Sequence, residues 1–78
     1  MAQRSQAHAA LGRAIRDFRG RRHISQEDLA HRAGMHRTYL GGIERGERNP
    51  SYTNLLKVAT ALDVDTSELI RLAEELEG

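Results

Sequence analysis

Apolar residues recur every three or four positions along most of the chain, which is the spacing of one buried helix face. The first such stripe predicts a helix that runs from about Ala7 to near Arg22. Its apolar positions are Ala7, Leu11, Ala14, Ile15 and Phe18. Arginines follow the opposite side, so we expect this helix to cover a core with one face and to meet water with the other.

The segment from Ser25 to Asn49 predicts two short helices joined by a tight turn, and the remaining elements are expected to support this pair. Ser25 is a favourable N-cap, because its hydroxyl can accept from free amides of the first turn. Gly34 can take the left-handed conformation that ends a helix. The small side chain of Ala30 allows the two helices to cross steeply, which is typical of a helix-turn-helix.

Two further helices are predicted after Pro50. Ser51 can cap the first of them, and Asp65 can cap the second, with Glu68 in the capping-box position. The last helix is apolar over a wider arc than one core contact requires, which indicates a partner interface. We therefore predict an all-α fold, a compact five-helix domain at residues 7–78 that follows a flexible N-terminus at residues 1–6.

Composition narrows the class of protein. A chain of 78 residues without cysteine is expected to form one small domain with no disulfide and no cysteine-based metal site. No apolar run approaches the roughly 20 residues that span a bilayer, and the N-terminus lacks an export signature. We expect a cytoplasmic protein.

Charge is distributed unevenly along the chain. Residues 1–50 hold ten Arg and five acidic residues, a net charge of +5, whereas residues 51–78 carry a net charge of −4. Arg binds phosphate and guanine with two parallel hydrogen bonds, which Lys cannot do. The basic part contains the helix pair and favours a polyanion such as nucleic acid as its partner.

Other site chemistries are not supported by the residue pattern. No two histidines share a helix face at ligand spacing among His8, His23, His31 and His36, so we expect no metal and no cofactor. Ser25 is required as a helix cap, and no glycine-rich phosphate loop follows a strand. We therefore do not expect an enzyme.

A family resemblance covers roughly residues 11–72. The residues that carry it are Ile24-Ser25-Gln26, Leu29-Ala30, Ala33-Gly34, Tyr39-Leu40, Ile43-Glu44-Arg45-Gly46, Asn49-Pro50-Ser51, Leu55, Val58-Ala59, Leu62 and Val64. The chain resembles the Cro/repressor-type helix-turn-helix proteins, the XRE family. Within that family, the Arg-Thr-Tyr and Glu-Arg-Gly-x-Arg-Asn runs look most like the controller proteins of restriction–modification systems.

The resemblance implies a lambda-repressor-like DNA-binding fold whose third helix is the recognition helix. It also implies that Arg19 pairs with Glu44. Two positions depart from the family pattern. His36 stands where a capping Ser is frequent, and Gly42 stands at a frequent base-contacting position, where it can offer only backbone.

We expect base readout from the start of the recognition helix. Arg37 can reach O6 and N7 of a guanine together, and Thr38 can donate to a base or lie against a thymine methyl. Tyr39 can reach phosphate or a base edge through its hydroxyl; the alternative is a ring packed between helices.

Phosphate contacts are expected around the recognition helix. Gln26, at the start of the preceding helix, can bind a phosphate together with free amides. Arg48 and Asn49 lie in the loop that follows the recognition helix. Arg45 is either a phosphate contact or a solvated charge, and His36 can contact phosphate when protonated.

The expected function is sequence-specific transcriptional regulation by a homodimer on a pseudo-palindromic operator. The residues expected to form the two-fold contact are Leu69, Ile70, Leu72 and Leu76. A phage-type repressor and an antitoxin that represses its own operon are alternatives, which the neighbouring genes would separate. A protein-interaction adaptor with the same fold is an alternative of a different class.

Overall fold

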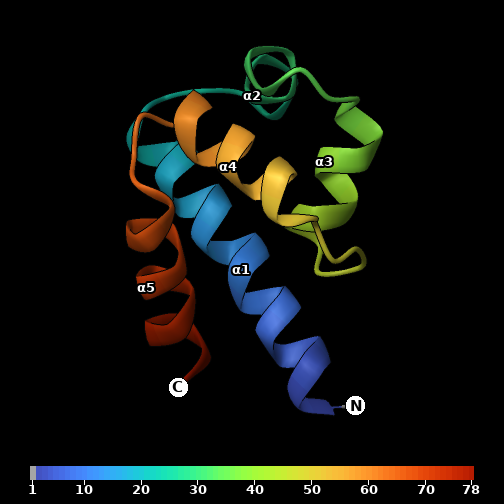
Figure 1. Cartoon of the computed structure of the whole chain (residues 1–78), viewed down its shortest axis with the longest axis vertical. Coiled ribbons are helices and arrows are strands. Elements are labelled where there is room, and N and C mark those ends of the chain that lie inside the picture. Colours follow the sequence, from blue (N-terminus) through green and yellow to red (C-terminus); the bar gives the residue numbers. More distant parts are fainter. Residues whose placement is uncertain (1) are drawn as a thin grey trace.

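The computed structural model describes residues 2–78, with side chains described from Gln6 onward, and contains five helices connected by short turns (Figure 1). Their bounds are α1 Ala2–Arg21, α2 Gln26–Ala33, α3 Arg37–Glu44, α4 Tyr52–Ala61 and α5 Thr66–Glu77. The predicted all-α, five-helix class is confirmed, and the described residues form no strand. None of the described helices is both long and apolar enough to cross a membrane.

The first helix begins earlier than its apolar stripe predicts. We expected it to start near Ala7, whereas α1 starts at Ala2. Ala, Gln and Arg are good helix formers, and no Pro or Gly precedes Gly12. The helix therefore extends toward the N-terminus, beyond the first residue that packs in the core. The prediction of a flexible segment at residues 1–6 falls in part outside the described residues.

The predicted helix ends are confirmed where they depend on a local cap. The Ser25 hydroxyl accepts from the backbone N of Asp28 at 3.0 Å, and the Ser51 hydroxyl accepts from that of Asn54 at 3.1 Å. Gly34 ends α2 with a left-handed φ of +69°. At the start of α3, His36 makes no side-chain cap hydrogen bond, in agreement with the missing Ser.

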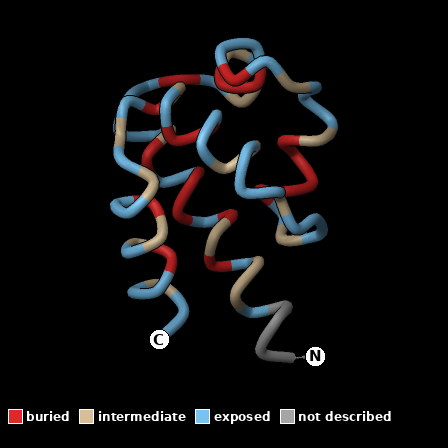
Figure 2. Tube along the Cα trace, viewed as in Figure 1, coloured by how far each residue is buried: buried red, intermediate tan, exposed pale blue. Residues whose placement is uncertain are grey.

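The core is built from residues of all five helices. Burial follows the inward faces of the helices, as the red segments of Figure 2 show. The largest fully buried apolar side chains are Ile15, Leu29, Leu40, Ile43, Leu62, Leu69 and Val58. The first and last helices, α1 and α5, lie side by side, and α1 also packs against α3.

The prediction that Leu69 belongs to a two-fold contact is wrong. Leu69 is 0 % exposed, and with Ala73 it forms the face of α5 that packs into the core. Leu72 and Leu76 are half-buried and also pack against this core, whereas Ile70 is half-buried but is not among the residues packed there. The wide apolar arc of α5 is therefore partly used by α1.

Candidate nucleic-acid interface

The third helix, α3, which the family resemblance implies to be the recognition helix, is held against α1 at its C-terminal end. Gly12 lies so close to this end that an ideal Cβ on it would stand 2.3 Å from the carbonyl oxygen of Glu44 and 2.7 Å from that of Ile43. The Arg16 guanidinium donates to the same Glu44 carbonyl. The last turn of α3 is thus seated directly on the backbone of α1.

A buried carboxylate fixes the same end of α3 from the side. Glu44 accepts two hydrogen bonds from the Arg19 guanidinium, each at 3.0 Å, which is the ion pair that the family resemblance implies. The side chain of Glu44 is 1 % exposed and that of Arg19 is 20 % exposed. Gln26 also donates to Glu44, at 3.0 Å. The carboxylate therefore joins α1, the start of α2 and the end of α3.

The start of α3 is the exposed end. His36, Arg37 and Thr38 are all exposed, and within the described residues Arg37 and Thr38 form no side-chain hydrogen bond or ion pair. This is the outward placement that readout of bases requires. Contact with DNA by these three residues stays a prediction.

Tyr39 is tied into the protein more closely than the other residues of the first turn. Its ring is half-buried and packs against the core, and its hydroxyl accepts from the Asn54 amide at 3.0 Å. The alternative of a ring packed between helices therefore describes the ring, while the hydroxyl still has a lone pair and a proton available.

The structure covers Gly42 with the side chain of Arg48, whereas the sequence suggests a bare backbone at Gly42 and a loop phosphate contact at Arg48. Gly42 is buried, because the Arg48 side chain folds back over it, with its Cδ 2.9 Å from where a Cβ on Gly42 would stand. The Arg48 guanidinium carbon lies 5.8 Å from the centre of the Tyr39 ring. The backbone of Gly42 is thus covered, and the cation of Arg48 lies along the recognition helix.

The other loop residues remain at the surface. Arg45 pairs with Glu47 at 3.1 Å, and both side chains are more than half exposed, so this pair contributes little stability. Asn49 is exposed. Arg45 is a solvated cation in this structure, and its approach to a phosphate would require it to exchange Glu47 for that partner.

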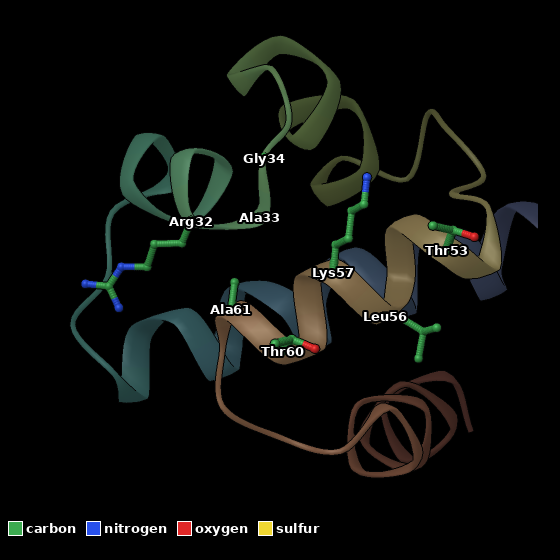
Figure 3. A pocket seen from close by; sticks show the side chains of 8 residues that line it. All are labelled: Arg32, Ala33, Gly34, Thr53, Leu56, Lys57, Thr60 and Ala61. Atoms are coloured by element: carbon green, nitrogen blue, oxygen red, sulfur yellow. The ribbon is translucent and has the colours of Figure 1, made fainter.

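A surface hollow of about 600 Å³ lies between the end of α2 and the outer face of α4 (Figure 3). Figure 3 shows Arg32 pointing away from α4 and Leu56 pointing from α4 toward α5. None of the residues that line it belongs to α3. The hollow is therefore separate from the exposed first turn of the recognition helix.

Sequence reasoning missed three residues that build this site. Gly12 and Arg16 seat α3 on α1, and Asn54 holds the Tyr39 hydroxyl. Gly12 carried a usable signal, because a glycine in a helix interior costs roughly 1 kcal/mol and often indicates close backbone approach. Arg16 and Asn54 are polar residues on helices, as are most residues of an exposed helix face. No local sequence signal therefore identifies them as part of the site.

Comparison with known proteins agrees with this geometry. Control protein C.SmaI of Serratia marcescens is 40% identical over 60 residues, covering 77% of this chain and 71% of that protein. The crystal structure of the restriction-modification controller protein C.AhdI from Aeromonas hydrophila matches with a TM-score of 0.78 and 47% identity, covering 80% of this chain and 94% of that chain. The controller protein C.Esp1396I, solved as a tetramer in complex with its natural 35 base-pair operator, matches with a TM-score of 0.82 and 27% identity over 91% and 93% of the two chains. Residues 15–69 match the model of a helix-turn-helix family, and the chain therefore belongs to this XRE-type helix-turn-helix family.

Proposed function

We propose that this protein is a sequence-specific transcriptional regulator that binds double-stranded DNA as a homodimer, in the manner of a restriction–modification controller protein. The observation that carries the proposal is the exposed first turn of α3, whose Arg37 and Thr38 side chains form no hydrogen bond or ion pair within the described residues. The relation to C.SmaI and C.AhdI supports it, as does the operator complex of C.Esp1396I.

In this proposal, the first turn of α3 enters the major groove and reads base edges. Arg37 binds a guanine through O6 and N7, and Thr38 binds the neighbouring base. Arg48 lies over Gly42 with its cation along the same helix, so it supplies a guanidinium to the part of the groove that Gly42 cannot read. This role differs from the purely phosphate-binding one that its loop position suggested.

Phosphates on both sides of the groove fix the orientation of the protein. In this proposal, Gln26 at the start of α2 and His36 before α3 contact one strand, together with free amides at the helix N-termini. Asn49 and Arg45 follow α3 and contact the backbone on the other side. The hydroxyl of Tyr39 is a further donor for phosphate or a base edge.

Replacing Arg37 with Ala is expected to weaken operator binding by about 1–3 kcal/mol and to relax base preference at one position. The reason is that a bidentate arginine distinguishes guanine from the other bases. The measurement is selection from a randomised duplex pool, followed by titration of the selected sequence at fixed salt. Arg32→Ala removes the same charge from the exposed end of α2, outside the proposed DNA and dimer contacts, and serves as the control. Equal behaviour of the two variants would contradict the role of Arg37.

The two-fold contact is proposed to involve the outer side of α5 and the neighbouring part of α4. Ile70, Leu72 and Leu76 remain partly accessible, and Leu56 on α4 is 38 % exposed and points toward α5 (Figure 3). Such a dimer would place two recognition helices about 34 Å apart, in successive major grooves.

We expect the protein to sediment as a dimer at micromolar concentration and the Ile70→Glu variant to sediment as a monomer. A buried charge without a partner is costly, so one glutamate at the centre of the contact should shift the equilibrium strongly. His31→Glu adds the same charge on the exposed side of α2 and should leave the dimer intact. A wild-type protein that is monomeric with and without DNA excludes the dimer.

A further inference from the structure

We propose that Glu44 is a positioning residue for DNA binding, which acts by holding the side-chain amide of Gln26 in the orientation that binds phosphate. This inference rests on the proposed function, because it concerns the same surface. Glu44 itself is buried within the protein and does not touch DNA in this proposal.

The geometry links the two residues directly. The Gln26 Nε2 donates to Glu44 Oε1 at 3.0 Å, and the same oxygen accepts from the Arg19 guanidinium at 3.0 Å. The other carboxylate oxygen accepts from Arg19 Nε at 3.0 Å. Because the Arg19 fork holds both oxygens, the carboxylate is a fixed acceptor. Each oxygen keeps one further lone pair, and the Gln26 amide occupies that of Oε1.

The Glu44 carboxylate also fixes the orientation of the Gln26 side-chain amide. An ionised carboxylate can only accept, so the NH₂ end of Gln26 must point toward Glu44 and its carbonyl oxygen must point elsewhere. In the structure that oxygen lies 3.6 Å from where a Cβ on Gly41 would stand. The second N–H of the amide remains available as a donor for a phosphate oxygen.

Without Glu44, the Gln26 side chain would sample several rotamers and both amide orientations. In one of the two amide orientations the carbonyl oxygen of Gln26 points at the phosphate, and the two negatively polarised oxygens repel each other. Binding would then have to order this side chain, which lowers the affinity for DNA. In the wild-type protein the side chain is already ordered before DNA binds. Among the described hydrogen bonds, the one to Glu44 is the only one that the Gln26 side chain makes.

A double-mutant cycle tests the coupling. The probe is a labelled duplex that carries the sequence selected by the wild-type protein, titrated with wild type, Gln26→Ala, Glu44→Leu and the double variant. Leu has a similar volume to Glu but no acceptor for the Gln26 amide. Each single variant is expected to bind about fivefold more weakly, and the double variant is also expected to bind about fivefold more weakly, because the two act as one unit. An additive loss of about twenty-fivefold would overturn the positioning role.

Two controls separate positioning from general instability. Val58→Ala creates a cavity in the core at α4 without touching this network, and it should change DNA affinity less than twofold at a temperature where all variants are folded by circular dichroism. Gln26→Asn keeps the amide but shortens it, so that it cannot reach Glu44. This variant should bind as weakly as Gln26→Ala, and wild-type affinity for it would overturn the inference.

The free protein provides a readout that does not depend on DNA. In ¹⁵N-resolved NMR spectra, one side-chain amide proton of Gln26 should exchange slowly in wild type and in Val58→Ala, and rapidly in Glu44→Leu, which has no acceptor for it. Rapid exchange in the wild type would overturn the positioning role. If the wild-type protein selects no duplex at all, the proposed function fails instead, and the NMR result still reports separately on the contact.

Discussion

Replacing Arg19 with Met is expected to destabilise the domain by about 3 kcal/mol, measured as the shift in a urea unfolding curve. The variant leaves the carboxylate of Glu44, which is 1 % exposed, without its cation and with only the Gln26 amide as a side-chain partner. A chain of this length is expected to have a total stability of about 4–12 kcal/mol, so the variant should lose a large share of it.

The compensating substitution distinguishes a lost ion pair from lost packing. Replacing both members, Arg19→Met with Glu44→Leu, removes the buried charge together with its partner. Buried ion pairs exchanged for apolar residues of similar size are often neutral in stability. The double variant should therefore recover most of the loss, and a double variant as unstable as Arg19→Met would show that the charge is not the cause.

Gly12→Ala is expected to destabilise the protein by about 2–3 kcal/mol, although alanine is normally the better helix former. The added methyl group would stand 2.3 Å from the Glu44 carbonyl oxygen, and the atoms that it meets are backbone atoms of α3 that cannot rotate away. The two helices must separate to admit it, and this displaces the recognition helix relative to α2.

Gly20→Ala in the same helix is the matched control for this prediction. No atom lies within 4 Å of where its Cβ would stand, so the substitution should follow the ordinary helix propensity and stabilise the protein slightly. Thermal unfolding of the two variants should therefore shift in opposite directions. Equal shifts would contradict the close approach of α1 to the end of α3.

The features that the sequence predicted correctly are those encoded locally. The hydroxyls of Ser25 and Ser51 begin helices and Gly34 ends one, because each interacts with backbone only a few residues away. The apolar stripe likewise identifies Leu40 and Ile43 as core residues. Hence the five helices and the exposed start of α3 could be predicted from the chain alone.

The incorrect or missed details depend on which elements pack together. The broad apolar surface of α5 predicts Leu69 as part of the two-fold contact. Only the packing of α5 against α1 shows that this side chain is buried in the core. The fold of Arg48 over Gly42 depends on the path of a loop, which residue type does not encode. A glycine inside a helix indicates a close backbone approach at Gly12. The sequence does not show that the approaching segment is the end of α3.

The pairing of α1 with α5 has a consequence for how the protein forms during synthesis. The helix that seats the recognition element is made before the other four described helices, yet its main neighbour, α5, is made after the other four. Contacts between segments so distant along the chain form late, because the intervening loop must close before they are gained. A nascent chain interrupted before α5 should therefore leave α1 without that cover, and competence to bind an operator should arise only once α5 has been made.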